Sequence, residues 1–63
     1  MEFKVWVYEE DCYSGEWYEI CEDSVMLKED SIAELQRVLQ ELDKTYHGLA
    51  RFDEDGTIRV EQL

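Results

Sequence analysis

The chain has 63 residues, of which 44% are apolar and eight are aromatic, and its 17 acidic and six basic side chains give a net charge of −11. A chain of this length forms at most one domain and buries only about 60% of the surface that its unfolded form exposes, so it has little room for an enclosed active site. The apolar content excludes intrinsic disorder, and the charge excludes direct binding to nucleic acid or to an anionic membrane, both of which attract basic surfaces.

The first third of the chain predicts a β-hairpin. Residues 2–9 (EFKVWVYE) and 16–22 (EWYEICE) are rich in aromatic and β-branched side chains, which are typical of strands. Between them EDCYSG forms a turn in which Gly15 can adopt a positive φ. Residues 24–27 (SVML) indicate a short third strand.

The middle of the chain predicts an amphipathic helix over residues 32–46. Ser31 and Glu34 fit the capping box that starts a helix, and Gly48 stands where a C′ glycine ends one. Apolar side chains recur at spacings of three and four, which places them on one face. They are Ile32, Leu35, Val38, Leu39, Leu42 and Tyr46.

The last segment, LARFDEDGTIRVEQ, predicts a second hairpin. A three-residue loop over 54–56 pairs Phe52 with Ile58 and, on the same face, Ala50 with Val60. Arg51 and Arg59 then lie together on the other face, an arrangement that requires acids between them.

These elements predict an α+β fold for a single domain over 1–63, in the order ββαββ, with one antiparallel sheet and one helix on one of its faces. Alternation along the strands assigns side chains to the two faces. Phe3, Val5, Val7, Tyr18 and Ile20 are expected to face the helix, and Trp6, Tyr8, Trp17 and Cys21 the opposite side. Because one helix covers only one face, the exposed tryptophans need a cover from a partner, a second copy of the chain or the chain's own tail.

The sequence predicts no metal, no cofactor and no enzymatic activity. If Gly56 held the sixth position of a calcium loop, Arg51 and Gln62 would hold the first and twelfth, where carboxylates are needed. Cys12 and Cys21 have no second ligand at zinc spacing, and no glycine-rich phosphate loop is present. With no secretory segment and no membrane-spanning run, we expect a cytosolic protein with reduced thiols.

The remaining prediction is a protein-binding surface on the first hairpin. From Val5 to Leu27 there are seven acids and no base. Carboxylates along a strand, at about 3.3 Å per residue, form a sparser version of the phosphate track of DNA, at about 3.4 Å per phosphate. The predicted partner is the basic surface of a nucleic-acid-binding protein. The candidate charged contacts are Glu9, Glu10, Asp11, Glu16 and Glu19, and the candidate anchors are Trp6, Tyr8 and Trp17.

In size, charge, acidic aromatic hairpin and lack of catalytic motifs, the chain resembles the small acidic proteins that phages use against host nucleic-acid enzymes. These include anti-CRISPR proteins, anti-restriction proteins and inhibitors of uracil-DNA glycosylase. The resemblance implies inhibition by occupying a DNA- or RNA-binding groove.

The order "FKVWVYEED…SGEWYEI" followed by "DSIAELQRVLQEL" is also similar to HicB-type antitoxins, although their glycine-rich turn and proline-containing loop are missing. This second resemblance implies an alternative, in which Trp6, Tyr8 and Trp17 form a homodimer interface.

Overall fold

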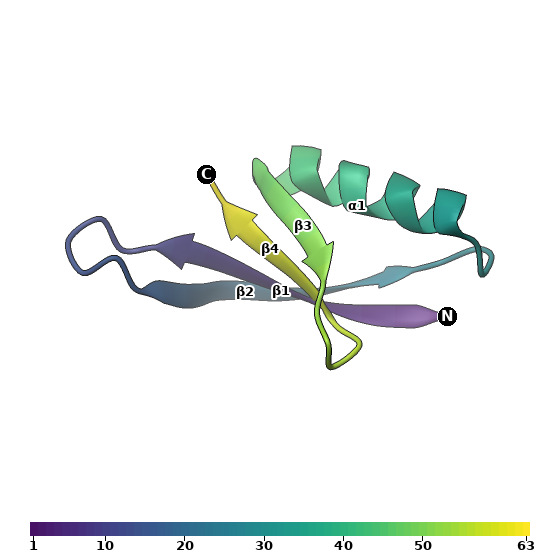
Figure 1. The fold of residues 1–63 in the computed structure, drawn as a ribbon, viewed down its shortest axis with the longest axis horizontal. Helices are drawn as coiled ribbons and strands as arrows, with labels where there is room; N and C mark the ends of the chain where they lie inside the picture. The colour runs from purple at the N-terminus through teal and green to yellow at the C-terminus, as the bar shows by residue number, and fades with distance from the viewer.

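The computed structural model describes all 63 residues as one four-stranded sheet with a single helix packed on it (Figure 1). The elements, in chain order, are β1 (Glu2–Glu10), β2 (Trp17–Met26), α1 (Ile32–Tyr46), β3 (Gly48–Phe52) and β4 (Ile58–Gln62). The strands lie in the order β2-β1-β4-β3. The predicted α+β class and ββαββ order are therefore confirmed.

The sheet is mixed rather than wholly antiparallel as predicted. β2 and β1 are antiparallel, as are β3 and β4, but β1 and β4 run parallel at the centre of the sheet. The parallel pair arises because the chain crosses over through α1 and β3 before β4 enters beside β1. The two predicted hairpins are thus joined by the crossover into one sheet.

β2 is a single ten-residue strand, so the prediction of a separate strand over 24–27 is wrong. It pairs with β1 along its whole length, and the backbone N–H of Leu27 donates to the carbonyl of Met1 at 2.8 Å.

A bulge interrupts this ladder. Cys21 lies opposite Val7, but Glu19 lies opposite Tyr8, so Ile20 is the extra residue. A one-residue shift moves side chains to the other face of a sheet. Cys21 therefore packs against the core on the helix side, and its predicted place beside Trp17 is wrong.

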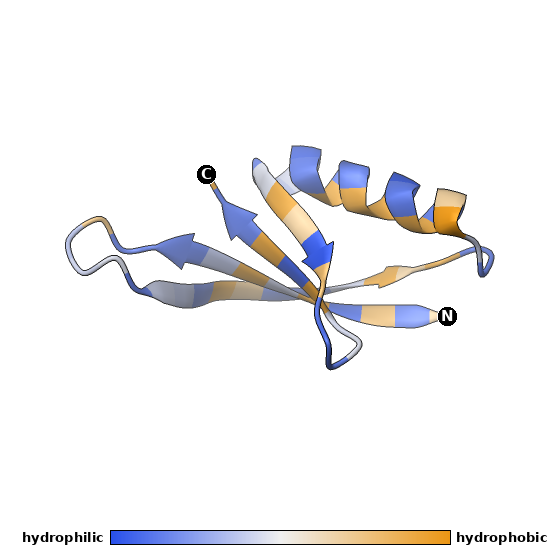
Figure 2. Ribbon diagram, in the orientation of Figure 1, coloured by the Kyte–Doolittle hydropathy of each residue, from blue (hydrophilic) through white to orange (hydrophobic).

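The core lies between the helix and the centre of the sheet. Four side chains of the parallel strand pair, Val5, Val7, Ile58 and Val60, are completely buried. Leu27, Val38 and Leu42 complete the core, and Phe3, Leu35, Leu39 and Phe52 are among the side chains that pack at its border. Figure 2 shows the apolar positions of the helix on the side that faces the sheet.

Two side chains expected to face the helix, Tyr18 and Ile20, remain 46% and 40% exposed. The reason is geometric, because this part of the hairpin extends beyond the end of the helix (Figure 1). Tyr18 lies on the helix side of the sheet as predicted, but the helix covers neither Tyr18 nor the bulged Ile20. Ile32, expected on the apolar stripe of the helix, is also 74% exposed.

The helix begins as predicted but ends differently. The Ser31 hydroxyl accepts a hydrogen bond from the backbone N–H of Glu34 at 3.1 Å, which confirms the N-cap. At the other end His47, with φ of 53°, takes the left-handed conformation that we expected of Gly48. Gly48 is instead the first residue of β3, where a Cβ atom would collide with the backbone carbonyl of Glu61. Its role is to allow β3 and β4 to approach closely.

The second hairpin forms as predicted. Phe52 pairs with Ile58 and Ala50 with Val60, and a bond of 2.9 Å from the N–H of Asp53 to the carbonyl of Thr57 closes the loop. Gly56 has a φ of 84°, which a three-residue hairpin loop requires of its last residue.

We expect Leu42→Ala to lower the free energy of unfolding by ~2–5 kcal/mol, because it leaves a cavity under the helix. Ile32→Ala, on the same helix but largely exposed, should change it by less than ~0.5 kcal/mol. Urea denaturation of both variants measures the difference. Equal effects would show that the helix does not pack on the sheet through Leu42.

Gly48→Ala should destabilise the fold by ~1–3 kcal/mol, the usual cost of forcing atoms into a filled space. His47→Gly should stabilise it by ~1 kcal/mol, since a non-glycine residue is strained in the left-handed region. Thermal unfolding of the two variants tests the pair. A neutral Gly48→Ala would contradict the close approach of β3 and β4.

Candidate functional site

The end of the β1–β2 hairpin, residues 8–20, extends from the body of the domain and is here named the hairpin arm (Figure 1). β4 pairs with β1 only from Val5 to Tyr8, so beyond Tyr8 the two strands of the arm pair only with each other. The arm contains no basic residue and five acids, and none of these acids takes part in an ion pair. They are Glu9, Glu10, Asp11, Glu16 and Glu19.

One of these acids builds the turn at the tip of the arm. The Asp11 carboxylate accepts hydrogen bonds from the backbone N–H groups of Tyr13 and Ser14, at 2.8 and 3.2 Å. The Ser14 hydroxyl accepts from the N–H of Glu16 at 3.2 Å, and Gly15 has a φ of 72°. Asp11 is therefore held by its role in the turn, whereas the carboxylate of Glu16 is free at the tip.

The other candidate residues of the arm are divided between its two faces. Glu10 pairs with Trp17 and Tyr8 with Glu19, on the face opposite the helix. Glu9 pairs with Tyr18 and projects to the helix side, where partial desolvation and the charge of Glu9 raise the pKa of Tyr18. The arm thus carries carboxylates on both faces and at its tip, with an aromatic side chain beside them on each face.

Two of the predicted aromatic anchors are covered by the chain itself. The Lys4 ammonium lies over the ring of Trp6 at 4.7 Å from its centroid, and the Arg59 guanidinium lies over Tyr8 at 3.9 Å. Both rings are half-buried. Trp17 has no such cation and is 38% exposed, so it is the anchor that the structure leaves most available.

The basic residues on the sheet face opposite the helix pair with acids of the body of the domain. Lys4 lies 3.0 Å from Glu22, and Glu61 lies between Arg51 and Arg59 at 3.1 and 3.6 Å. This confirms the prediction that the two arginines are neighbours and that an acid separates them. The body thus neutralises part of its own charge, and the arm does not.

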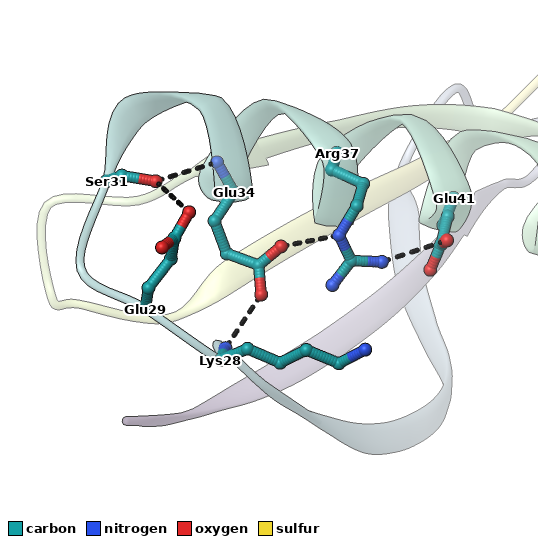
Figure 3. Close-up of polar contacts among 6 residues, drawn as sticks. All are labelled: Lys28, Glu29, Ser31, Glu34, Arg37 and Glu41. Atoms are coloured by element: carbon teal, nitrogen blue, oxygen red, sulfur yellow. Dashed lines mark hydrogen bonds and ion pairs between the residues drawn. The ribbon is translucent and has the colours of Figure 1, made fainter.

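A second polar cluster joins the start of the helix to the end of β2 (Figure 3). The buried carboxylate of Glu34 accepts hydrogen bonds from the backbone N–H of Lys28, at 2.7 Å, and from the Arg37 guanidinium. Arg37 also donates to Glu41 at 2.9 Å. A complete capping box would also have the Glu34 carboxylate accept from the N–H of Ser31, and this second bond does not form because the carboxylate binds Lys28 and Arg37. The Glu34–Arg37 spacing of three was the signal in the sequence for an ion pair.

The Glu34 cluster is a structural feature. The hydrogen bond from Arg37, followed by that from the Lys28 N–H, lowers the pKa of Glu34 from 4.5 to about 2, which keeps it charged at neutral pH. A carboxylate fixed in this way is unsuited to proton transfer near pH 7.

No group of three or more His, Cys, Asp or Glu side chains is placed to hold a metal ion, and both cysteines are free. The 15-residue helix is too short and too polar to cross a membrane. Comparison with known proteins gives no match to a family model, to a curated protein or to a solved structure.

Glu34→Gln should lower the melting temperature at pH 7, because it removes the charge that Arg37 and the Lys28 N–H stabilise. The folded pKa is depressed, so this contribution is complete above pH ~4.5 and is lost as pH falls towards ~2. The stability difference between the parent and Glu34→Gln should therefore shrink over that range. Urea denaturation at a series of pH values measures it.

Glu41→Gln is the matched control, since it is also an acid paired with Arg37 but its side chain is 66% exposed. Its effect should be small at every pH. A difference between the parent and Glu34→Gln that persisted at pH ~2 would contradict the assignment.

Proposed function

We propose that the protein is an inhibitory binding protein whose hairpin arm occupies the nucleic-acid-binding groove of a host enzyme. The observation that carries this proposal is the distribution of charge, with five acids in no ion pair on a projecting arm that contains no base. A groove that binds DNA or RNA is basic and is open to a narrow, negatively charged element. The arm has this form.

The two kinds of side chain on the arm have different roles in this mechanism. Carboxylates on both faces and at the tip steer the arm towards a basic groove and raise the association rate. The indole of Trp17, exposed beside Glu10, supplies apolar contact area once the arm is bound. The protein needs no catalytic group, because an occupied groove excludes the nucleic acid.

The homodimer is the less supported alternative. It depends on uncovered aromatic rings on the sheet face opposite the helix, and Lys4 and Arg59 already cover Trp6 and Tyr8. A second copy would also bring a further net charge of −11 close to the first. Sedimentation at several concentrations distinguishes the two, since the proposal expects a monomer.

The first step of the experiment is capture of the target from a nuclease-treated bacterial lysate, with identification by mass spectrometry. The purified target is then titrated with labelled DNA or RNA in the presence of the protein. The proposal expects competition for nucleic acid, with an association rate that falls steeply as salt rises. A captured target that binds nucleic acid equally well with the protein attached would contradict it.

Glu9→Lys with Glu10→Lys should weaken inhibition by about tenfold or more, because both changes place positive charge on the arm. Asp53→Lys with Glu54→Lys is the control, since it makes the same change in net charge in the other hairpin turn. Asp11 and Asp55 are left intact because their carboxylates hold turns. Equal losses from both double variants would assign the effect to bulk charge.

A further inference from the structure

The two edges of the sheet differ in their protection. At the β3 edge, the carboxylate of Asp43 on the helix accepts the backbone N–H of Ala50 at 2.6 Å. β2 forms the other edge and is the longest strand. It contains no lysine, arginine or proline, and its acids and the bulge at Ile20 are the features that discourage pairing, so it discourages an acidic strand more than a basic one.

The hydrogen bonds of β2 show which of its amides are available. The N–H of Leu27 donates a hydrogen bond to the carbonyl of Met1 at 2.8 Å, and the amino group of Met1 donates to the carbonyl of Leu27 at 3.3 Å. In an antiparallel ladder, pairs that exchange hydrogen bonds alternate with pairs that do not. Met26, Ser24 and Glu22 belong to the second kind, so their amides point away from β1. The N–H of Ser24 is bonded to the Asp23 carboxylate at 2.8 Å, which leaves Glu22 and Met26 with outward-pointing donors.

A groove of about 290 Å³ runs beside this edge, between β2 and the helix. Apolar side chains of the lining come from Val25, Val38 and Leu42, and acids come from Asp23 and Glu41. The one base in the lining, Arg37, is bonded to Glu34 and Glu41. The hydroxyl of Tyr46 donates to Asp23 at 2.7 Å, and this bond lowers the pKa of Asp23, which stays charged at neutral pH.

We propose that the β2 edge and this groove form a docking site for an extended segment of a partner protein. The segment adds as a fifth strand along residues 21–26, beyond the bulge. Its backbone bonds to the outward amides and carbonyls, and a side chain with an apolar stem and a cationic end enters the groove. Strand addition beside a helix-lined groove is a recurring way of binding peptides, in which backbone bonds give affinity and side-chain pockets give specificity.

Charge complementarity selects a basic segment rather than a second copy of this chain. β2 carries Glu19, Glu22 and Asp23 and no base. Two β2 strands paired with each other would join two strands without a base and two chains of net charge −11, which is unfavourable. A segment with lysine or arginine at alternate positions can place these side chains on the groove side of the sheet, beside Asp23 and Glu41.

This inference rests on the proposed function, because it gives the inhibited enzyme a second contact besides the arm. The arm and the β2 edge belong to the same hairpin but use different residues. The test below uses the protein alone with a synthetic peptide, so its failure would leave the proposed function standing. A failure of the arm variants to affect inhibition would leave the peptide site standing.

The probe is a fluorescein-labelled ten-residue peptide of alternating lysine and valine, titrated with the full chain by fluorescence anisotropy. N-methylation of one alternate set of peptide amides should abolish binding, and N-methylation of the other set should not, because only one set faces β2. Equal effects of both sets, or equal binding of a glutamate–valine peptide, would overturn the proposal.

Variants and hydrogen exchange locate the site. Glu41→Lys should weaken binding by about tenfold, whereas Glu54→Lys, with the same change in net charge, should alter it by less than about twofold. Amide exchange followed by NMR should show that the peptide protects Glu22 and Met26. Protection elsewhere, equal losses in the two variants, or a dimer that excludes the peptide would each overturn the assignment.

Discussion

The parallel pairing of β1 with β4 is the contact on which the other features of the domain depend. It brings Val5 and Val7 from the start of the chain beside Ile58 and Val60 from its end, and all four side chains are completely buried. Every other strand is an edge strand attached to this pair, and the helix rests on it. The pairing with β4 ends at Tyr8, but β1 continues to Glu10 and turns into β2. The end of the hairpin therefore lies beyond the core, and this end is the arm.

The domain tolerates its net charge of −11 because some acids of the body are paired with bases and others lie away from the core. Some acids in the body of the domain are paired with bases, as Glu34 is with Arg37, Glu22 with Lys4 and Glu61 with Arg51. The exposed pair Lys4–Glu22 contributes little stability individually, but each pair removes one uncompensated negative charge from the body. The five acids of the arm are in no ion pair, but they lie away from the core, where their repulsion acts on few core contacts.

Local signals in the sequence predicted the elements well. The helix bounds, the Ser31 cap, the loop around Gly56 and the pairing of Phe52 with Ile58 all follow from residues close to one another in the chain. The parallel β1–β4 pair did not follow, because it joins segments about 50 residues apart and no local pattern encodes it. The bulge at Ile20 was equally hidden, and it moved Cys21 to the helix side.

For the candidate surface, the sequence predicted which residues are acidic and aromatic but not how they are held. The sequence predicted Asp11 as a charged contact, but its carboxylate accepts two hydrogen bonds within the turn. The cation that lies over Trp6 belongs to Lys4, two residues away in the chain. The cation that lies over Tyr8 belongs to Arg59, on a strand that is distant in the sequence. Side-chain contacts across a sheet depend on strand order, which the sequence left open.

The arm lies apart from the core, so the residues of the proposed function differ from those that stabilise the fold. Changes in the arm outside its turn affect no buried residue, so its surface can vary without loss of the fold. The repulsion among the five arm acids is a cost to the free protein that a basic partner relieves on binding. Salt screens both interactions, so it stabilises the free domain while it weakens the complex. An arm with unpaired charge is therefore more costly to keep than a neutral one, and the proposed basic groove is the kind of partner that offsets the cost.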